Sequence, residues 1–140
     1  MPLFKRNIPA PIFDGPPEDP QWVKAAQGKF ARLLRVDPEK EGLAGVSGVV
    51  VIWHAGVRPC WVFIGCAGDL AEYLHKIGRN RAIMDYEVNG GLYVTWSLIR
   101  AEFQPGVVKY LGTLLKPLVE NPTLANIDEN PIPVIAPTHG

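Results

Sequence analysis

Residues 47–65 read SGVVVIWHAGVRPCWVFIG, and they decide the fold because they hold two apolar runs on either side of a turn signal. The runs at 47–54 and 60–65 are rich in Val, Ile, Trp and Phe, which favour strands. Residues 55–59 between them contain a glycine and a proline, which favour a reversal of the chain. The stretch therefore predicts an antiparallel β-hairpin.

A helix and a third strand are predicted after the hairpin. Asp69 suits an N-cap position, and the apolar residues after it recur at helical spacing until Gly78 ends the pattern. Residues 79–90 carry mixed signals and are predicted to form a turn or a short helix. Residues 92–99, which read LYVTWSLI, are rich in strand-forming types and predict the third strand.

A last helix completes the predicted core. Pro105 suits the first turn of a helix over 105–118, and Pro117 ends or kinks that helix. Residues 46–121 are thus predicted to fold as an α+β domain with the element order β-β-α-β-α. Its sheet is expected to be small, three-stranded and antiparallel, with helices flanking it.

An extra helix is predicted before this core, over residues 19–37. Asp19 and Pro20 supply the N-cap acid and the first-turn proline that are typical of a helix start. The apolar residues from 22 to 34 keep helical spacing, and Asp37-Pro38 ends the pattern. The other side of the predicted helix carries four basic residues: Lys24, Lys29, Arg32 and Arg35.

The prolines gather near the two ends of the sequence. Of the 14 prolines, six lie in residues 1–20 and five in residues 117–140. Because proline fixes φ and lacks a backbone donor, residues 1–18 and 122–140 are predicted to be extended arms. We expect each arm to pack on the domain itself or on a neighbouring subunit, because both hold apolar residues that a solvated linker would lack. These residues are Leu3, Phe4, Ile8, Ile12, Phe13, Ile132, Val134 and Ile135.

Composition and charge narrow the class of protein. The 140 residues fit one domain, and an apolar share of 47% is enough for a core. Fourteen basic residues balance 14 acidic ones, so the net charge is zero. Because phosphate neutralisation supplies most of the affinity for nucleic acid, a protein with that main task usually carries a basic excess. Nucleic acid is therefore not the favoured partner.

Targeting signals are not recognised in the sequence. The N-terminal residues lack the basic and apolar regions of a secretory signal, and no apolar run is long enough to span a bilayer. Cys60 and Cys66 flank one predicted strand at a separation that a disulfide does not reach, so they are predicted to be free thiols. We expect synthesis in the cytoplasm and no contact with a membrane.

Two tripeptides carry a resemblance to a known family. Gly48-Val49-Val50 opens the first strand, Phe63-Ile64-Gly65 closes the second, and twelve residues separate them. Together with the helix pattern after Gly65 and the later Pro117 and Asn121, this arrangement resembles the GIY-YIG nuclease domain. The resemblance covers about residues 46–121 and implies a GIY-YIG-like fold for that part of the chain.

The resemblance also implies which residues would perform catalysis in such a domain. The two tyrosine positions hold Val50 and Phe63, the arginine position holds Tyr73, and the metal-binding glutamate position holds Val108. Valine offers no oxygen to a metal, and tyrosine offers no positive charge to a phosphoryl group. We therefore predict a pseudoenzyme without catalytic residues, metal or cofactor.

The face of the sheet that would form the catalytic groove is predicted to be apolar. Val50 and Phe63 mark this face, with Ile52 and Trp61 beside them. A sheet that is apolar on both faces has to be covered on both. The helices at 69–77 and 105–118 are expected to cover one side. The other side then needs the predicted N-terminal helix, an arm or another protein.

Histidines and cysteines were weighed as alternative sites. His54, His75 and His139 do not form a metal-ligand spacing with the cysteines. His54 is expected opposite Cys60 in the hairpin, but no orienting acid accompanies the pair, so a buried, inert thiol is the favoured interpretation.

The favoured function is that of a non-catalytic structural subunit of a larger assembly, such as a phage-like particle, a tail or a multi-protein machine. Both arms are expected to dock on neighbouring chains. In that case removal of residues 1–18 or 122–140 leaves the core folded and abolishes the complex. The residues expected to make these contacts are Phe4, Ile8, Ile12, Phe13, Trp61, Phe63, Ile132, Val134 and Ile135.

Two alternatives remain open at this point. One is a nucleic-acid-binding module that keeps the groove of the family without cleavage. The other is a residual metal-dependent endonuclease, for which Asp69, Glu72 and Glu102 are the nearby acids.

Overall fold

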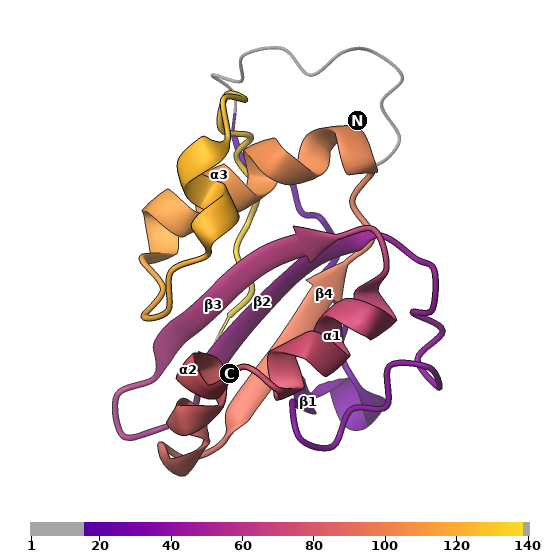
Figure 1. Cartoon of the computed structure of the whole chain (residues 1–140), viewed down its shortest axis with the longest axis vertical. Helices are drawn as coiled ribbons and strands as arrows, with labels where there is room; N and C mark the ends of the chain where they lie inside the picture. Colours follow the sequence, from indigo (N-terminus) through magenta and orange to yellow (C-terminus); the bar gives the residue numbers. More distant parts are fainter. Residues whose placement is uncertain (1–15, 139–140) are drawn as a thin grey trace.

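The predicted hairpin is present and lies at the centre of the fold. The computed structural model describes residues 16–138, in which β2 (Gly48–His54) pairs antiparallel with β3 (Cys60–Ala67). On its other side β2 pairs antiparallel with β4 (Leu92–Ser97), and β4 pairs with the short strand β1 (Ala31–Arg32). The sheet therefore has four strands in the order β1-β4-β2-β3, one more than predicted (Figure 1).

Within residues 16–138, three α-helices accompany the sheet, and two begin at caps that the local sequence supplies. Helix α1 (Leu70–Gly78) starts after Asp69, whose carboxylate accepts a hydrogen bond of 3.2 Å from the backbone N–H of Glu72. Helix α2 (Arg81–Met84) starts in the same way after Asn80. Helix α3 (Gln104–Leu115) ends at Lys116, whose φ of 50° is left-handed. Short 3-10 turns lie at Ala26–Gly28, Asp85–Val88, Ala101–Phe103 and Pro122–Asn126.

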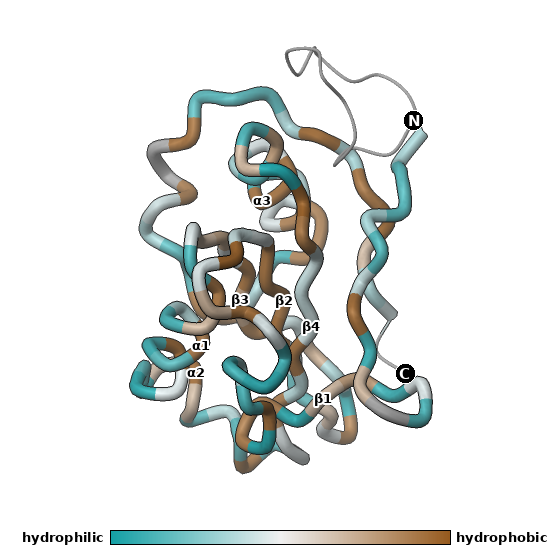
Figure 2. The backbone as a smooth tube through the Cα atoms, turned by 90° about the vertical axis from the view of Figure 1, so that its right-hand side faces the viewer, coloured by the Kyte–Doolittle hydropathy of each residue, from teal (hydrophilic) through white to brown (hydrophobic). Residues whose placement is uncertain are grey.

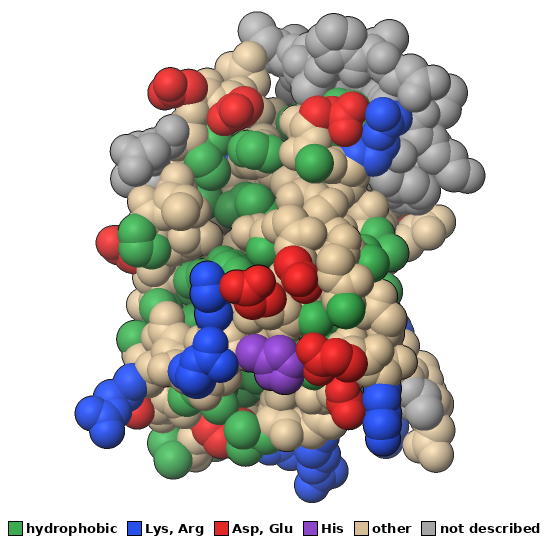
Figure 3. All heavy atoms as spheres, turned by 45° about the vertical axis from the view of Figure 1, so that its right-hand side comes forward, with side chains coloured by type: hydrophobic (Ala, Val, Ile, Leu, Met, Phe, Trp, Pro, Cys, Tyr) green, Lys and Arg blue, Asp and Glu red, His purple; other side chains and the backbone are tan. Residues whose placement is uncertain are grey.

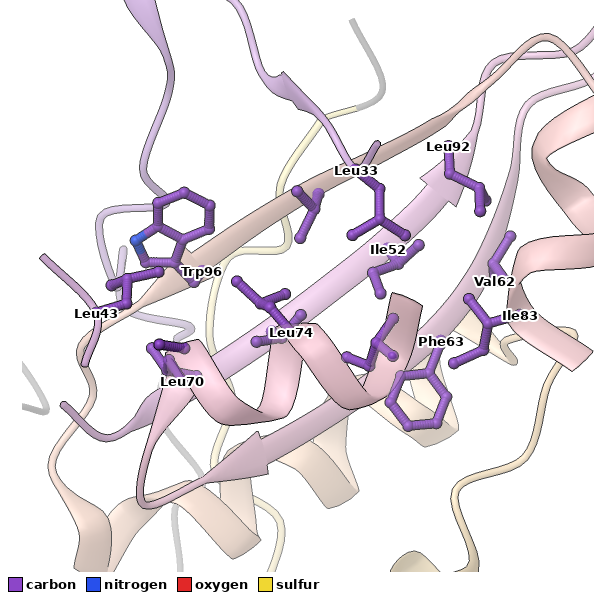
Figure 4. Packing of buried hydrophobic residues seen from close by; sticks show 14 residues of the cluster. Leu33, Leu43, Ile52, Val62, Phe63, Leu70, Leu74, Ile83, Leu92 and Trp96 are labelled. Carbon is purple, nitrogen blue, oxygen red and sulfur yellow. The ribbon is translucent and has the colours of Figure 1, made fainter. Parts of the chain in front are cut away.

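The two longer helices lie on opposite faces of the sheet, so the expectation that they cover the same side was wrong (Figure 1). Leu70 and Leu74 of α1 and Ile52 of β2 belong to the first core, which Figure 4 shows between α1 and the sheet. Val107 and Leu111 of α3 belong to a second core on the other face. The physical reason is the alternation along β2, which presents large apolar side chains to both faces and leaves all seven of its residues buried.

A β-bulge places Trp61 on a face that simple alternation does not predict. The register runs from Ile52 opposite Phe63 to Trp53 opposite Trp61, so Val62 is an extra residue on β3. Val62 and Phe63 therefore both join the first core, whereas Trp61 packs against the second. The prediction that Trp61 and Phe63 share a face was wrong for this reason.

The helix predicted over residues 19–37 is not formed. Gln21, Gln27 and Gly28 have φ values of 63°, 65° and 69°, which no α-helix accommodates. The segment runs instead along β4: the N–H of Val23 donates to the carbonyl of Trp96 at 3.0 Å. The hydroxyl of Thr95 donates back to the carbonyl of Val23 at 2.7 Å. The free edge of β4 thus outcompetes local helix propensity, because its backbone groups need partners.

The residues of the predicted C-terminal arm pack on the chain's own domain. Ile132 and Val134 are 2% and 1% exposed and complete the second core against α3. The N–H of Ile132 donates to the carbonyl of Gly106 at 3.0 Å. The approach is so close that a Cβ at Gly106 would lie 2.7 Å from the Ile132 side chain. Removal of residues 122–140 is therefore not expected to leave the core intact, which corrects the expectation from sequence.

Both ends of the described chain meet on this side of the molecule (Figure 2). Val134 forms a parallel bridge with Glu18, and the N–H of Ile135 donates to the Glu18 carbonyl at 2.8 Å. The indole N–H of Trp22 donates to the carbonyl of Ile135 at 2.7 Å. The other predicted arm, residues 1–18, lies outside the described residues except for its last three.

Replacement of Ile132 by alanine tests this packing. We expect Ile132→Ala to lower the free energy of unfolding by about 2–5 kcal/mol, because it leaves a cavity between α3 and the sheet. The measurement is chemical denaturation followed by tryptophan fluorescence. Ile135→Ala is the matched control, since Ile135 is 51% exposed and its loss is expected to change stability by about 0.5 kcal/mol or less. Equal effects of the two variants would contradict the described position of the C-terminal residues.

Candidate functional site

The four positions that the family resemblance marks as catalytic do not converge in one groove. Val50, Phe63 and Tyr73 belong to the first core or pack against it, on the α1 side of the sheet. Val108 lies in the second core, on the α3 side, and is 1% exposed. Val50 is fully buried and Phe63 is 6% exposed. The predicted apolar groove is thus filled by the chain's own side chains.

The hydroxyl of Tyr73 lies close to Gly65 of β3. A Cβ at Gly65 would lie 2.1 Å from the Tyr73 hydroxyl oxygen and 3.1 Å from Nδ2 of Asn121. The side chain of Asn121 donates a hydrogen bond of 3.0 Å to the carbonyl of Ile64. Only a residue without a side chain fits between them, which gives Gly65 a packing role in this structure.

The titratable groups of this cluster are poor acids at neutral pH. Burial, and after it the nearby Cys66, raise the pKa of Tyr73 to about 12, against a hydrogen bond with Asn121 that lowers it. Burial likewise raises the pKa of the Cys66 thiol. A general base or a thiolate nucleophile needs a pKa near the working pH, and neither group meets this condition.

The three acids considered for a residual nuclease have structural partners on the surface. Asp69 caps α1, and hydrogen bonds from the backbone of Glu72 and then of Gly45 lower its pKa. The carboxylate of Glu72 lies 3.8 Å from the Lys76 ammonium, and that of Glu102 lies 3.2 Å from the Arg100 guanidinium. Residues 16–138 contain no group of three or more potential ligands placed to hold a metal.

Each described histidine, and Cys60, makes local contacts that do not form a shared site. His54 is buried and its ring stacks on Tyr86 at 6.0 Å, while its Nδ1 accepts a hydrogen bond from the N–H of Gly56. Cys60 is its cross-strand neighbour, as predicted, and donates from Sγ to the carbonyl of Arg58. His75 contacts the Glu39 carboxylate at 2.9 Å, and His139 lies outside the described residues.

The residues expected to contact partner chains differ in how far they are buried. Phe63, Ile132 and Val134 are buried in this chain's own cores, so their side chains are not presented to a partner. Trp61 is partly buried against the second core, whereas Ile135 is half exposed. Phe4, Ile8, Ile12 and Phe13 lie outside the described residues.

A pair of exposed valines was not anticipated from the sequence. Val57 in the β2–β3 turn is fully exposed, and Val88 at the end of a 3-10 turn is 89% exposed. Their two loops pack together: a Cβ at Gly90 would lie 2.7 Å from the carbonyl oxygen of Ala55. We call Val57 and Val88 the valine tip.

The charge distribution around the rest of the surface is mixed. Figure 3 shows basic and acidic side chains interspersed on the face that it draws, without a continuous basic area. This agrees with a net charge of zero and gives no extended track for a phosphate backbone on that face. No helix within residues 16–138 has the length and apolarity to cross a bilayer.

Comparison with known proteins adds no relative. No protein family, curated protein or solved structure matches this chain.

The raised pKa of Tyr73 has a measurable effect on stability. An unfolded tyrosine ionises near pH 10, whereas Tyr73 in the folded chain ionises near pH 12. Between these values the unfolded state has released a proton that the folded state keeps, so the free energy of unfolding falls as the pH rises through this window. We expect Tyr73→Phe to remove this part of the decrease.

The measurement is the free energy of unfolding at several alkaline pH values. Tyr110→Phe, which changes a partly buried tyrosine of α3, is the control and is expected to keep the pH dependence of the unchanged chain. Identical profiles for the unchanged chain and Tyr73→Phe would show that Tyr73 is not the group responsible.

Proposed function

We propose that this chain is a non-catalytic interaction subunit of a larger protein assembly and that the valine tip is its docking surface. The observation that carries the proposal is the exposure of two neighbouring valines on loops that hold each other in place. Burial of a valine side chain contributes roughly 1.5 kcal/mol or more, so a partner that covers both gains a compact apolar anchor.

The surroundings of the valine tip suit a protein partner. Arg58 follows Val57 and is exposed, and Asn89 follows Val88 and is also exposed. An apolar centre with a polar and cationic rim is the usual composition of a protein interface. A hollow lined by both loops and by His54 lies between the valines and gives a partner side chain a place to enter.

We also propose that this chain performs no catalysis. The positions that would carry GIY-YIG chemistry are occupied by Val50, Phe63, Tyr73 and Val108, and they are divided between two packed cores. We propose that the domain is a degenerate relative of that nuclease fold, retained for its shape. This origin and a place in an assembled particle rest on the resemblance of short motifs and on the lost residues.

The N-terminal residues are proposed as a second contact with neighbouring chains. The apolar residues of this segment are Phe4, Ile8, Ile12 and Phe13, which alternate with prolines and charged residues. Extended segments of this composition add contact area to an assembly through tethering. The C-terminal residues are left out of this role because Ile132 and Val134 belong to the chain's own core.

A double variant tests the valine tip. We expect Val57→Ser with Val88→Ser to release the chain from its native high-mass complex while thermal stability stays the same, since both side chains are exposed. The measurement is size fractionation of the complex in extracts of cells that make the tagged chain, with chemical cross-linking to identify the neighbours. Leu98→Ser is the control, because Leu98 is half exposed just after β4, at the other end of the sheet. A complex that survives the double variant would overturn the docking role of the tip.

A cleavage assay tests the loss of catalysis. We expect no cutting of single- or double-stranded DNA with Mg²⁺ or Mn²⁺, because the positions of the metal ligand and of the phosphate-binding cation are Val108 and Tyr73. Metal-dependent cleavage that Glu72→Gln or Glu102→Gln abolishes would contradict the proposal and favour the residual nuclease.

A further inference from the structure

A hollow lined by aromatic and basic side chains lies on the α3 side of the sheet, where β1, β2 and β4 are neighbours. Its volume is about 490 Å³. Its aromatic members are Phe30, Trp53 and Tyr93, all of which belong to the second core or pack against it.

The three rings form a continuous aromatic wall. Phe30 meets Trp53 edge-on with ring centroids 4.9 Å apart. Trp53 stacks on Tyr93 at 6.1 Å with an angle of 15° between the rings. Trp53 is 1% exposed, whereas Phe30 and Tyr93 are partly exposed. Because the Phe30 ring is nearly perpendicular to Trp53 and Tyr93 is nearly parallel to it, a planar ligand can stack on Phe30 or on Tyr93 but not on both.

Two cations and no acid line the same hollow. The guanidinium carbon of Arg32 lies 5.3 Å from the centroid of the Tyr93 ring, and Lys29 is exposed at the side. Lys24, next to the hollow, lies 5.1 Å over the Phe30 ring. Arg32 donates from Nη2 to Glu87 at 2.8 Å, but its buried Nε has no hydrogen-bond partner among the described residues. Lys24 and Lys29 bring positive charge to the edge of the hollow, whereas the charge of Arg32 is balanced by Glu87.

Gly91 and Glu87 hold the guanidinium of Arg32 in place. Gly91 has a φ of 94°, and a Cβ there would lie 2.4 Å from Nη2 of Arg32. The guanidinium therefore packs directly against the backbone of Gly91. Glu87, its ion-pair partner, also accepts a hydrogen bond of 2.9 Å from the N–H of Leu92. A charge held in this way loses little entropy when a ligand binds.

We propose that this hollow binds a nucleotide, with the base against one of the partly exposed rings, Phe30 or Tyr93, and the phosphate beside Lys29 and Arg32. Bases stack on aromatic side chains, and phosphate pairs with guanidinium and ammonium groups. The volume lies within the range of small-ligand sites. Zero net charge favours a free nucleotide over a long strand, because a strand needs a longer basic track. The site adjoins the valine tip at Ala55 but uses neither valine, so this proposal and the docking role succeed or fail separately.

The test is a titration of the full chain with AMP, followed by two-dimensional NMR of backbone and indole N–H groups. We expect saturable shifts at the Trp53 indole and around residues 28–32 and 91–93. Adenosine and ribose 5-phosphate are each expected to bind at least about tenfold more weakly than AMP, because each lacks one half of the recognised chemistry. Absence of saturable shifts at these residues with millimolar AMP would overturn the proposal.

Matched variants decide whether the hollow is the site. We expect Lys29→Glu to weaken AMP binding about tenfold or more, since it reverses an exposed charge at the hollow. Lys40→Glu reverses an equally exposed charge on a distant turn and is expected to change the affinity less than about twofold. Equal weakening by both variants would show non-specific attraction and overturn the assignment.

A second ligand distinguishes the source of the nucleotide. An oligoadenylate of eight residues, titrated in the same way, is expected to bind no more tightly per site than AMP if the ligand is a free nucleotide. Markedly tighter binding with a steep salt dependence would identify a single strand as the source of the same chemistry and overturn the preference for the free nucleotide.

Discussion

The central strand β2 imposes the constraint on which the rest of the structure depends. All seven of its residues are buried, and large apolar side chains point to both faces of the sheet. Such a strand is stable only when each face is covered by a separate layer. Helix α1 supplies one layer, and α3 together with the C-terminal residues supplies the other. The two cores that result fill the space between the sheet and its helices with apolar side chains.

The parts of the fold that follow from local signals could be predicted from the sequence. The signals for these elements are local: a turn, a cap or a periodicity lies within the element or directly beside it. This holds for the hairpin, for β4 and for the helices α1 and α3. The segment 19–37 could not be predicted, because its apolar residues keep helical spacing, and the partner that decides against a helix lies on β4. The face of Trp61 depends on a bulge at Val62, for which no residue type is a signal.

The candidate sites likewise have a part that could be predicted from the sequence and a part that could not. The residues at the four positions that the family resemblance marks can be read from the motifs, but their distribution between two cores depends on the placement of α3. The valine tip joins a turn at residues 55–58 with another at 88–90, more than thirty residues later. The aromatic hollow joins three strands. Each site is made by pairing of distant segments, and its residues have no common spacing in the sequence from which a motif could be recognised.

The bridge between Glu18 and Val134 has a consequence for synthesis of the chain. The second core needs Ile132 and Val134, so during synthesis it stays incomplete after α3 has been made, until these two residues are available. Contacts of such large sequence separation form late and slowly. During that interval part of the apolar surface of the second core is accessible to chaperones and to other nascent chains.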